Sequence, residues 1–396
     1  MKIAVFLPKE DFFHRFLGQS LKNAFTRVGA AVIDAPLRLE NAQVEALARE
    51  RRPDLIFDMN RTRNVLPGLP GETIHAAWMV DFDAKREEEI SGSELLYFLE
   101  AGWIPYFTQL RDRGGIVGER IDWLPAAACP ETFYPAPADK SLDFSFVGHL
   151  SAPWSEAELG RPVLVEGGRR ATFGEVLPPL ERRSLDLANG RVAAPELTDP
   201  GYQIHMLRGV LREMGFTGEP DLSDPALRYD VYTRVHRMAV RMEPLRLALG
   251  VSRNAAFYGT GGWEAWPEFR PYFHGWLEDQ ARAAELFRAT RLNLHNGVAN
   301  HFRVFFCMAA GGVVLHHRQR LDAGAEQLAR LGIESGVHYL SATSDDFAEQ
   351  ARHYLAHPEE LEAMGRRAAE WVHGHHLWDH RARRVMADAA AFRGGG

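Results

Sequence analysis

The chain has 396 residues, of which 46% are hydrophobic and 25% charged, and its formal net charge at pH 7 is −7. A chain of this length can form two domains, each with its own core. The composition is typical of a soluble globular protein, and the acidic balance argues against nucleic acid as the main partner. No stretch approaches the roughly 18 consecutive apolar residues of a membrane span.

The cysteines and the N-terminal sequence indicate a cytoplasmic protein. The two cysteines, Cys129 and Cys307, are too few for a disulfide framework, so we expect a reducing compartment. The N-terminal sequence MKIAVFLPKED runs directly into a predicted strand and lacks the longer apolar core of a signal peptide.

The first part of the chain alternates between strand and helix patterns. The predicted strands lie at residues 3–7, 30–34, 54–58, 74–80 and 122–124, the helices at 12–27 and 44–50, and residues 95–107 add one further unit. Strands separated by helices indicate a doubly wound parallel sheet. We place this first domain at residues 1–138, ending near a proline-rich stretch.

The second domain, predicted at residues 139–380, starts with a strand at 142–147. Residues 151–249 lack the α/β pattern, and we interpret them as a helical insertion that contains a short hairpin. Afterwards the predicted strands are 254–258, 292–294 and 313–316, and the predicted helices are 277–290, 302–310, 344–355, 358–373 and 377–392. This pattern predicts a second parallel sheet.

The segment LNLHNGVANHFRVFFCMAAGG, residues 292–312, places a helix start behind the carboxyl end of a strand. Unpaired backbone N–H groups and the helix dipole both favour an anion at such a point. The side chains with hydrogen-bond donors around it are His295, Asn296, Asn300, His301 and Arg303. A second loop, YGTGGW at residues 258–263, also follows a predicted strand, and its glycines allow close backbone approach to a ligand. An ordinary tight turn explains this loop equally well.

Together these segments resemble the CgeB-like glycosyltransferases of bacteria, which have the GT-B fold. That family shows LN-x-H, a polar loop and R-x-FE-x-M-A-x-G-G, and also a YG-x-GW loop. The matching residues of the first motif here are Arg303, Phe305, Met308, Ala309, Gly311 and Gly312. The resemblance implies two Rossmann-like α/β domains around a ligand cleft, with residues 381–396 crossing back to the first domain.

The resemblance also implies roles for individual residues. His301 and Arg303 would stabilise the leaving diphosphate, because fixed donors lower the barrier where negative charge develops. The implied donor-binding residues are Gly148, His149, Tyr258, Gly259, Gly261, Gly262, His295, Asn296, Asn300, Phe306 and Gly311. Phe306 stands where the family has a glutamate for the donor ribose. Either Asn296 or Asn300 holds the donor instead, the alignment is off by one helical turn, or transferase activity has been lost.

Two further groups of residues are candidates for chemistry. WMVDFD, residues 78–83, resembles the family's W-x-x-D region, so Asp81 would be the general base of an inverting enzyme. The alternative is that Asp81 only caps a helix predicted at residues 84–89. His14 and Arg15 are weaker acceptor-side candidates. The histidines of residues 373–380 have a spacing used by zinc sites, but without matching cysteines we expect packing roles there.

The sequence therefore predicts a cytoplasmic, hexosyltransferase-like enzyme that moves a sugar from a nucleoside-diphosphate donor to an unidentified glycan, protein or small-molecule acceptor. It predicts no metal and no other cofactor. Two alternatives stay open. One is a non-catalytic protein that binds a nucleotide or glycan, and the other is a nucleotide-sugar epimerase of the same fold.

Overall fold

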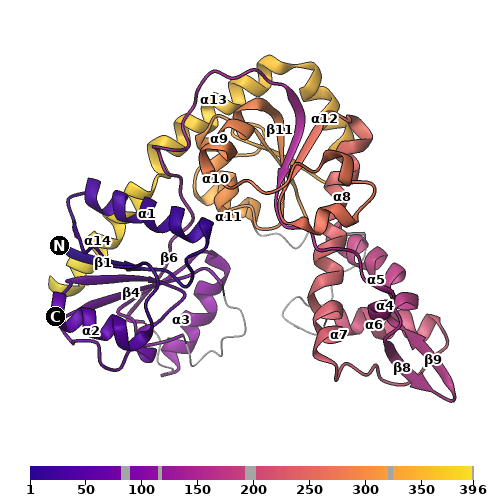
Figure 1. Cartoon of the computed structure of the whole chain (residues 1–396), viewed down its shortest axis with the longest axis horizontal. Helices are drawn as coiled ribbons and strands as arrows, with labels where there is room; N and C mark the ends of the chain where they lie inside the picture. The colour runs from indigo at the N-terminus through magenta and orange to yellow at the C-terminus, as the bar shows by residue number, and fades with distance from the viewer. Residues whose placement is uncertain (82–89, 115–117, 192–201, 320–323, 395–396) are drawn as a thin grey trace.

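A computed structural model describes residues 1–81, 90–114, 118–191, 202–319 and 324–394 of the chain. It contains two parallel sheets, each covered by helices, and a separate helical part (Figure 1). The helix predicted at residues 84–89 falls outside the described residues. Within the described residues, no helix combines the length and apolar character needed to cross a bilayer.

The first sheet has six parallel strands in the order β2-β1-β3-β4-β5-β6. The strands are β1 (Lys2–Phe6), β2 (Ala31–Val32), β3 (Leu55–Met59), β4 (Ile74–Met79), β5 (Leu95–Phe98) and β6 (Arg120–Trp123). The helices of this domain are α1 (Phe12–Arg27), α2 (Asn41–Arg51) and α3 (Ile104–Asp112), and α14 (Trp378–Gly394) joins them from the far end of the chain.

Side-chain alternation along the strands assigns these helices to the two faces of the sheet. Ile3 and Val5 share a core with α1 and α14, whereas Ala4 and Phe6 share one with α2. The strand residues of β3, β4 and β5 are buried on both faces. This explains why their sequences are apolar apart from the buried Asp58 and His75.

The second sheet has five parallel strands in the order β10-β7-β11-β12-β13. Its strands are β7 (Leu142–Val147), β10 (Ala255–Tyr258), β11 (Thr290–Asn296), β12 (Val314–His317) and β13 (Leu340–Ala342). Its helices are α8 (Val235–Val251), α9 (Gln280–Ala289), α10 (Phe302–Ala309), α11 (Gly324–Arg330), α12 (Phe347–Ala356) and α13 (Pro358–His375). The short edge strand β13 was not predicted. Helix α9 begins later than predicted because Asp279 caps it, accepting the Ala281 N–H at 2.8 Å.

The segment predicted as an insertion projects away from the second sheet (Figure 1). It contains α4 (Glu156–Leu159), the hairpin β8 (Pro162–Glu166) and β9 (Arg169–Thr172), α5 (Phe173–Ala188), α6 (Tyr202–Glu213) and α7 (Pro225–Tyr229). Helix α7 runs through a π-helical turn, Asp230–Arg234, directly into α8. The insertion is therefore joined to the second sheet through one continuous helical segment.

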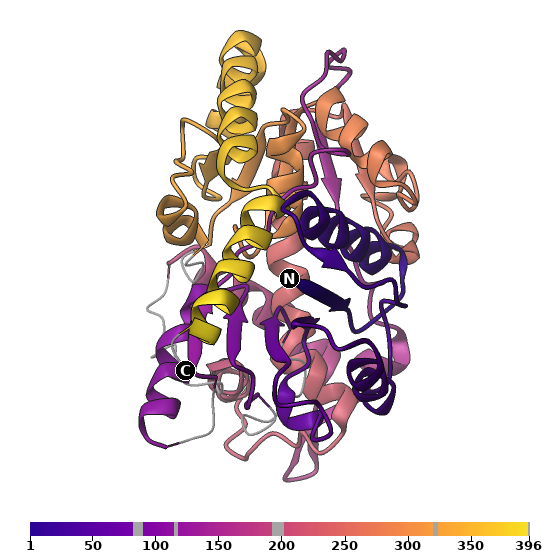
Figure 2. The ribbon, with the colours of Figure 1, turned by 90° about the vertical axis from the view of Figure 1, so that its left-hand side faces the viewer.

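The chain passes between the two domains twice, and the two passages pair with each other. The Ala128 N–H donates to the His376 carbonyl at 3.0 Å, and the Trp378 N–H donates to the Ala128 carbonyl at 3.1 Å. Beyond this point α13 is followed by α14, which lies across the first domain beside α1 (Figures 1 and 2). Two parallel α/β domains with a returning final helix form the GT-B fold, so the predicted fold class is confirmed.

Aromatic side chains join the first domain to α10. We name this group the aromatic seam; its members are Phe13, Phe16, Trp78, Phe133, Phe302, Phe306 and Trp378. Phe306 stacks on Phe133 with ring centroids 4.3 Å apart, and Phe302 meets Phe13 edge to face at 5.2 Å. The seam belongs to a hydrophobic core that continues from the first sheet into α9, α10 and α13.

We predict that Phe306→Ala lowers the free energy of unfolding by about 3–5 kcal/mol, because the ring is buried and its loss leaves a cavity between the domains. Urea unfolding followed by tryptophan fluorescence measures this change. Tyr134→Ala is the control, since that ring is 48% exposed, and we expect a change below about 1 kcal/mol. Equal, small effects for both variants would contradict a seam that stabilises the domain arrangement.

Candidate functional site

A cavity of about 510 Å³ lies between the two domains. It borders the loops that follow β1, β3 and β4 on one side and β7, β10 and β11 on the other, so both sheets present their carboxyl ends to it. The predicted site residues that line it are Asp81, Gly148, His149, Gly259, His301, Arg303 and Phe306, together with the weaker candidate His14.

A larger hollow of about 750 Å³ lies at the linker between the domains. It is lined by Lys140, Arg288 and Gly311, among others, and Lys140 Nζ donates to the Thr290 carbonyl at the start of β11. This hollow therefore faces the amino ends of the second sheet's strands. Open α/β sheets bind ligands at the opposite edge, so the interdomain cavity is the candidate site.

Arg303 lies at the inner wall of the cavity, in the first turn of α10. Its guanidinium donates to the Val147 carbonyl and lies over the Phe146 ring, 5.6 Å from the ring centroid. Burial, assisted by the charge of Arg241, lowers the pKa of Arg303 to about 9. The side chain is still protonated at neutral pH, which makes it a partly buried cation.

Arg241 is the second partly buried cation, and no sequence pattern identified it. It comes from α8, and its guanidinium donates to the His149 carbonyl. Its buried Nε atom has no hydrogen-bond partner among the described residues. Burial, followed by the charge of Arg237, lowers the pKa of Arg241 to about 10. No motif in the sequence marked this arginine, because it lies on α8, in a part of the chain without an α/β pattern, and reaches the cavity only through tertiary packing.

The charge of this wall is poorly compensated by the protein itself. Among the described lining residues, Asp81 is the only carboxylate, and it is exposed on the side of the first domain. Buried charges without a partner are strongly unfavourable. The arrangement of Arg241 and Arg303 therefore favours binding of an anion in the cavity.

Two histidines complete this wall as neutral groups. His301 caps α10, its Nδ1 accepting the Arg303 N–H at 3.3 Å, so its proton resides on Nε2. Burial, and then the charges of Arg303 and Arg241, hold the pKa of His301 well below its usual value. Burial and Arg241 also lower the pKa of His149. The sequence predicted an anion site at the unpaired backbone N–H groups of this helix start. Because His301 already accepts a hydrogen bond from the Arg303 N–H, side chains contribute more to the site than these backbone groups.

The glycines of the two loops are required by backbone packing. A Cβ atom at Gly259 would lie 1.9 Å from the Gly148 carbonyl oxygen, and one at Gly262 would lie 2.1 Å from that of Leu150. The indole of Trp263 donates to the same Gly148 carbonyl at 3.0 Å. Loops 148–152 and 259–263 thus form one rigid unit at the cavity, whereas Gly261 has open space around it.

Several predicted donor-binding residues do not line the cavity. His295 is buried behind it and bonds to the Val298 carbonyl, and the Asn300 amide donates to the carbonyl of Leu99 at 2.8 Å. The ring of Tyr258 stacks on His274, and Asn296 is buried. Gly261 and Gly262 are also absent from the cavity lining, and Gly311 borders the linker hollow.

Phe306 lines the cavity, but its ring is held in the aromatic seam against Phe133 and Phe16. Position 306, which the resemblance aligned with a glutamate, thus serves packing between the domains. The histidines of residues 373–380 make hydrogen bonds within the protein: His373 bonds to the Ala309 carbonyl and His376 to that of Leu331, each at 3.0 Å.

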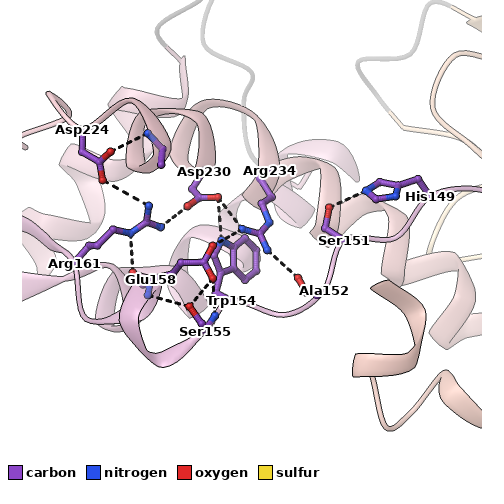
Figure 3. Close-up of polar contacts among 11 residues, drawn as sticks. His149, Ser151, Ala152, Trp154, Ser155, Glu158, Arg161, Asp224, Asp230 and Arg234 are labelled. Atoms are coloured by element: carbon purple, nitrogen blue, oxygen red, sulfur yellow. Dashed lines mark hydrogen bonds and ion pairs between the residues drawn. The ribbon is translucent and has the colours of Figure 1, made fainter. Parts of the chain in front are cut away.

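A polar network in the insertion holds the loop that carries His149 (Figure 3). Arg234, at the end of the π-helical turn, donates to the Ala152 carbonyl at 2.9 Å and to Asp230 at 3.2 Å. Asp230 is buried and also accepts hydrogen bonds from Trp154 and Arg161. Arg234 and Arg241 come from one helical segment and donate to two carbonyls of loop 148–152, those of Ala152 and His149, so this segment fixes that side of the cavity.

Residues 239–387 match a family model described as "Glycosyl transferase-like". The matched segment contains Arg241, His301 and Arg303 and most of the second sheet. This part of the chain is therefore glycosyl transferase-like in sequence. No curated protein matches the chain.

Solved structures similar to this chain include two described as glycosyltransferases and one protein in complex with UDP. AviGT4, involved in avilamycin A biosynthesis, is 13% identical, with 100% of this chain and 99% of that chain covered and a TM-score of 0.48. Anabaena HepE in complex with UDP is 12% identical, with 99% and 100% covered and a TM-score of 0.47. A glycosyltransferase from Rickettsia africae is 7% identical, with 99% and 98% covered and a TM-score of 0.46.

We predict that Asp230→Asn lowers the free energy of unfolding by about 3–5 kcal/mol, because it leaves the guanidinium groups of Arg161 and Arg234 without their buried carboxylate. Asp224→Asn is the matched control. That carboxylate is 48% exposed, lies 3.7 Å from Arg161 and caps α7, a role that Asn performs equally well. Chemical unfolding of both variants measures the difference, and equal losses would contradict the role of Asp230.

We predict that the protein loses stability as the pH falls from about 6.5 to 5. The folded chain keeps His301 neutral, so below the ordinary histidine pKa of about 6.5 only the unfolded chain takes up this proton. His301→Asn preserves a helix cap and removes the titrating group. Unfolding free energies at pH 7.5 and pH 5 should therefore differ less in the variant than in the wild type. The same loss in both proteins would show that His301 is not held neutral.

Proposed function

We propose that this protein is a glycosyltransferase that uses a nucleoside-diphosphate sugar. The observation that carries the proposal is the pair of partly buried arginines, Arg241 and Arg303, which face an interdomain cavity where the described lining residues offer no carboxylate beside them. Both lie in the glycosyl transferase-like segment. In this proposal residues 139–380 bind the donor and residues 1–138 bind the acceptor. Residues 381–396 cross back to the first domain and hold the two domains together.

In the proposed reaction, an acceptor hydroxyl forms a bond to the anomeric carbon while the bond from that carbon to the diphosphate breaks. The electron pair of the broken bond stays on the nucleoside diphosphate. Arg241 and Arg303 are fixed before the reaction and compensate this developing charge, so no reorganisation is needed during the step. The Nε2–H of His301 is a further donor. Because these side chains supply the charge, we expect turnover in the presence of EDTA.

The acceptor's proton requires a base if the reaction inverts the anomeric centre. Two side chains of the first domain face the cavity with this capacity, Asp81 and His14. His14 Nδ1 lies 2.7 Å from an oxygen of Asp11, which orients the ring. Asp81 was the predicted base, and we propose His14, a weaker acceptor-side candidate from the sequence, as an equal candidate because of its carboxylate partner.

The nucleobase end of the donor belongs, in this proposal, beside Trp276. This indole is 53% exposed and lines the cavity together with Leu277 and Gln280. An exposed aromatic face next to a cationic site suits a base followed by phosphates. The CgeB-like subfamily, a hexosyl donor, a bacterial source and a cytoplasmic location are also parts of the proposal, and the last is supported by two free, buried cysteines.

A non-catalytic binding protein is the second candidate, and the apolar use of position 306 favours it. A nucleotide-sugar epimerase is less favoured, because it needs acidic groups near the sugar and the described lining residues offer only Asp81. Incubation with UDP-, GDP- and dTDP-sugars, followed by NMR of the products, distinguishes transfer or donor hydrolysis, isomerisation, and binding without turnover.

We predict that Arg303→Met and Arg241→Met each reduce turnover on the order of 10²-fold or more and weaken binding of the nucleoside diphosphate, because each removes a fixed positive charge from the leaving group's site. Arg246→Met is the matched control. It lies on the same helix as Arg241 but pairs with Glu268 at 2.7 Å outside the cavity, so we expect unchanged kinetics.

Steady-state assays and isothermal titration with the nucleoside diphosphate make both measurements. Circular dichroism confirms that each variant is folded. Folded Arg241 and Arg303 variants with wild-type turnover and affinity would refute the proposed anion site. Weakened binding of the diphosphate, combined with absence of turnover in the wild type for every donor tested, would instead identify the binding protein.

A further inference from the structure

Three metal-ligand side chains meet at the junction of α12 and α13, outside the interdomain cavity. They are His353, His357 and Glu360, and their ligand atoms all lie within 4.8 Å of one another. His353 Nε2 lies 3.4 Å from Glu360 Oε2. Two ligands of a tetrahedral zinc ion with bonds of about 2.0–2.1 Å are separated by roughly 3.3–3.4 Å. This pair therefore already has the spacing that a bound ion requires.

The third side chain, His357, is oriented for metal binding by its own hydrogen bond. Its Nδ1 lies 2.7 Å from the His353 carbonyl oxygen, so Nδ1 carries the proton and donates it. The Nε2 lone pair is consequently left for a metal. Histidine ligands in metal sites commonly have their other ring nitrogen bound to a carbonyl in this way, because the bond fixes both tautomer and ring orientation.

Local sequence explains why the three side chains converge. His353 and His357 are four residues apart, a spacing that places them on the same side of a helix. His357 precedes Pro358, which disfavours helical backbone, so α12 ends there and α13 starts in a new direction. Glu360 in the first turn of α13 then points back toward the His353 ring.

The side chains of His353 and Glu360 are 48% and 46% exposed, so an ion can reach them from solvent and the rings can rotate. The two imidazoles lie with centroids 4.4 Å apart and planes inclined by 28°. Two imidazoles and one carboxylate suit Zn²⁺, Ni²⁺ or Cu²⁺, whereas Mg²⁺ and Ca²⁺ prefer oxygen ligands alone.

We propose that His353, His357 and Glu360 bind one divalent transition-metal ion, with water completing its coordination. The ion joins the end of α12 to the start of α13, the helix that leads into the segment returning to the first domain. This site is separate from the cavity and does not depend on the proposed transferase activity.

Isothermal titration of EDTA-treated and desalted protein with Zn²⁺ tests this proposal. We expect one ion per chain with micromolar affinity, no comparable binding of Mg²⁺, and a Zn²⁺-dependent rise in Tm. His353→Gln and Glu360→Gln should each weaken Zn²⁺ binding at least tenfold. Both side chains are half-exposed, so the variants are expected to fold.

His375→Gln provides the matched control. Its Nδ1 is also bonded to a carbonyl four residues earlier, that of Trp371 at 3.0 Å, but it belongs to no such three-ligand cluster in the described part of the chain. We expect this variant to bind Zn²⁺ like the wild type. Absence of a stoichiometric Zn²⁺ site, or wild-type affinity in the His353 and Glu360 variants, would overturn the proposal.

Discussion

The burial of aromatic rings between the two domains is the interaction on which the remaining structure depends. The aromatic seam brings Phe302 and Phe306 of α10 against side chains of the first domain, and the same helix starts with His301 and Arg303. Apolar packing at the seam and polar groups at the cavity are therefore parts of one element. Any movement that separated the domains at α10 would expose this apolar surface to water, which is costly.

Positive charge is concentrated in the cavity that remains between the packed domains. Arg241 and Arg303 come from segments far apart in the sequence, and their mutual repulsion is tolerated because each guanidinium bonds a main-chain carbonyl of the same region, His149 and Val147. Hydrogen bonds to carbonyls satisfy donors without neutralising charge. The site thus retains a positive potential that the protein scaffold maintains before any ligand binds, and glycine-mediated contact between loops 148–152 and 259–263 prevents it from relaxing.

The sequence was informative where local pattern determines structure. Strand and helix alternation gave both sheets, and the segment at residues 292–312 correctly placed α10, with His301 and Arg303 at the cavity. Arg241 was missed because its position depends on how the insertion packs against loop 148–152, which no local pattern encodes. The short strand β13 lacks enough residues for a recognisable period. The packing role of Phe306 depends on Phe133, which is distant in the chain and stacks on it, so the local sequence did not reveal this role.

The π-helical turn at Asp230–Arg234 sets the angular phase between two halves of a single helical segment. A wide turn of this kind accommodates one extra residue relative to a regular α-helix. Each residue advances an α-helix by about 100°. Winding the same residues as a regular α-helix, without the wide turn, would rotate the Asp230 end of the segment by roughly a quarter of a circle relative to Arg241. The orientation of the insertion relative to the cavity therefore depends on this one turn, and a change in helix geometry, without any change in side-chain chemistry, is enough to alter it.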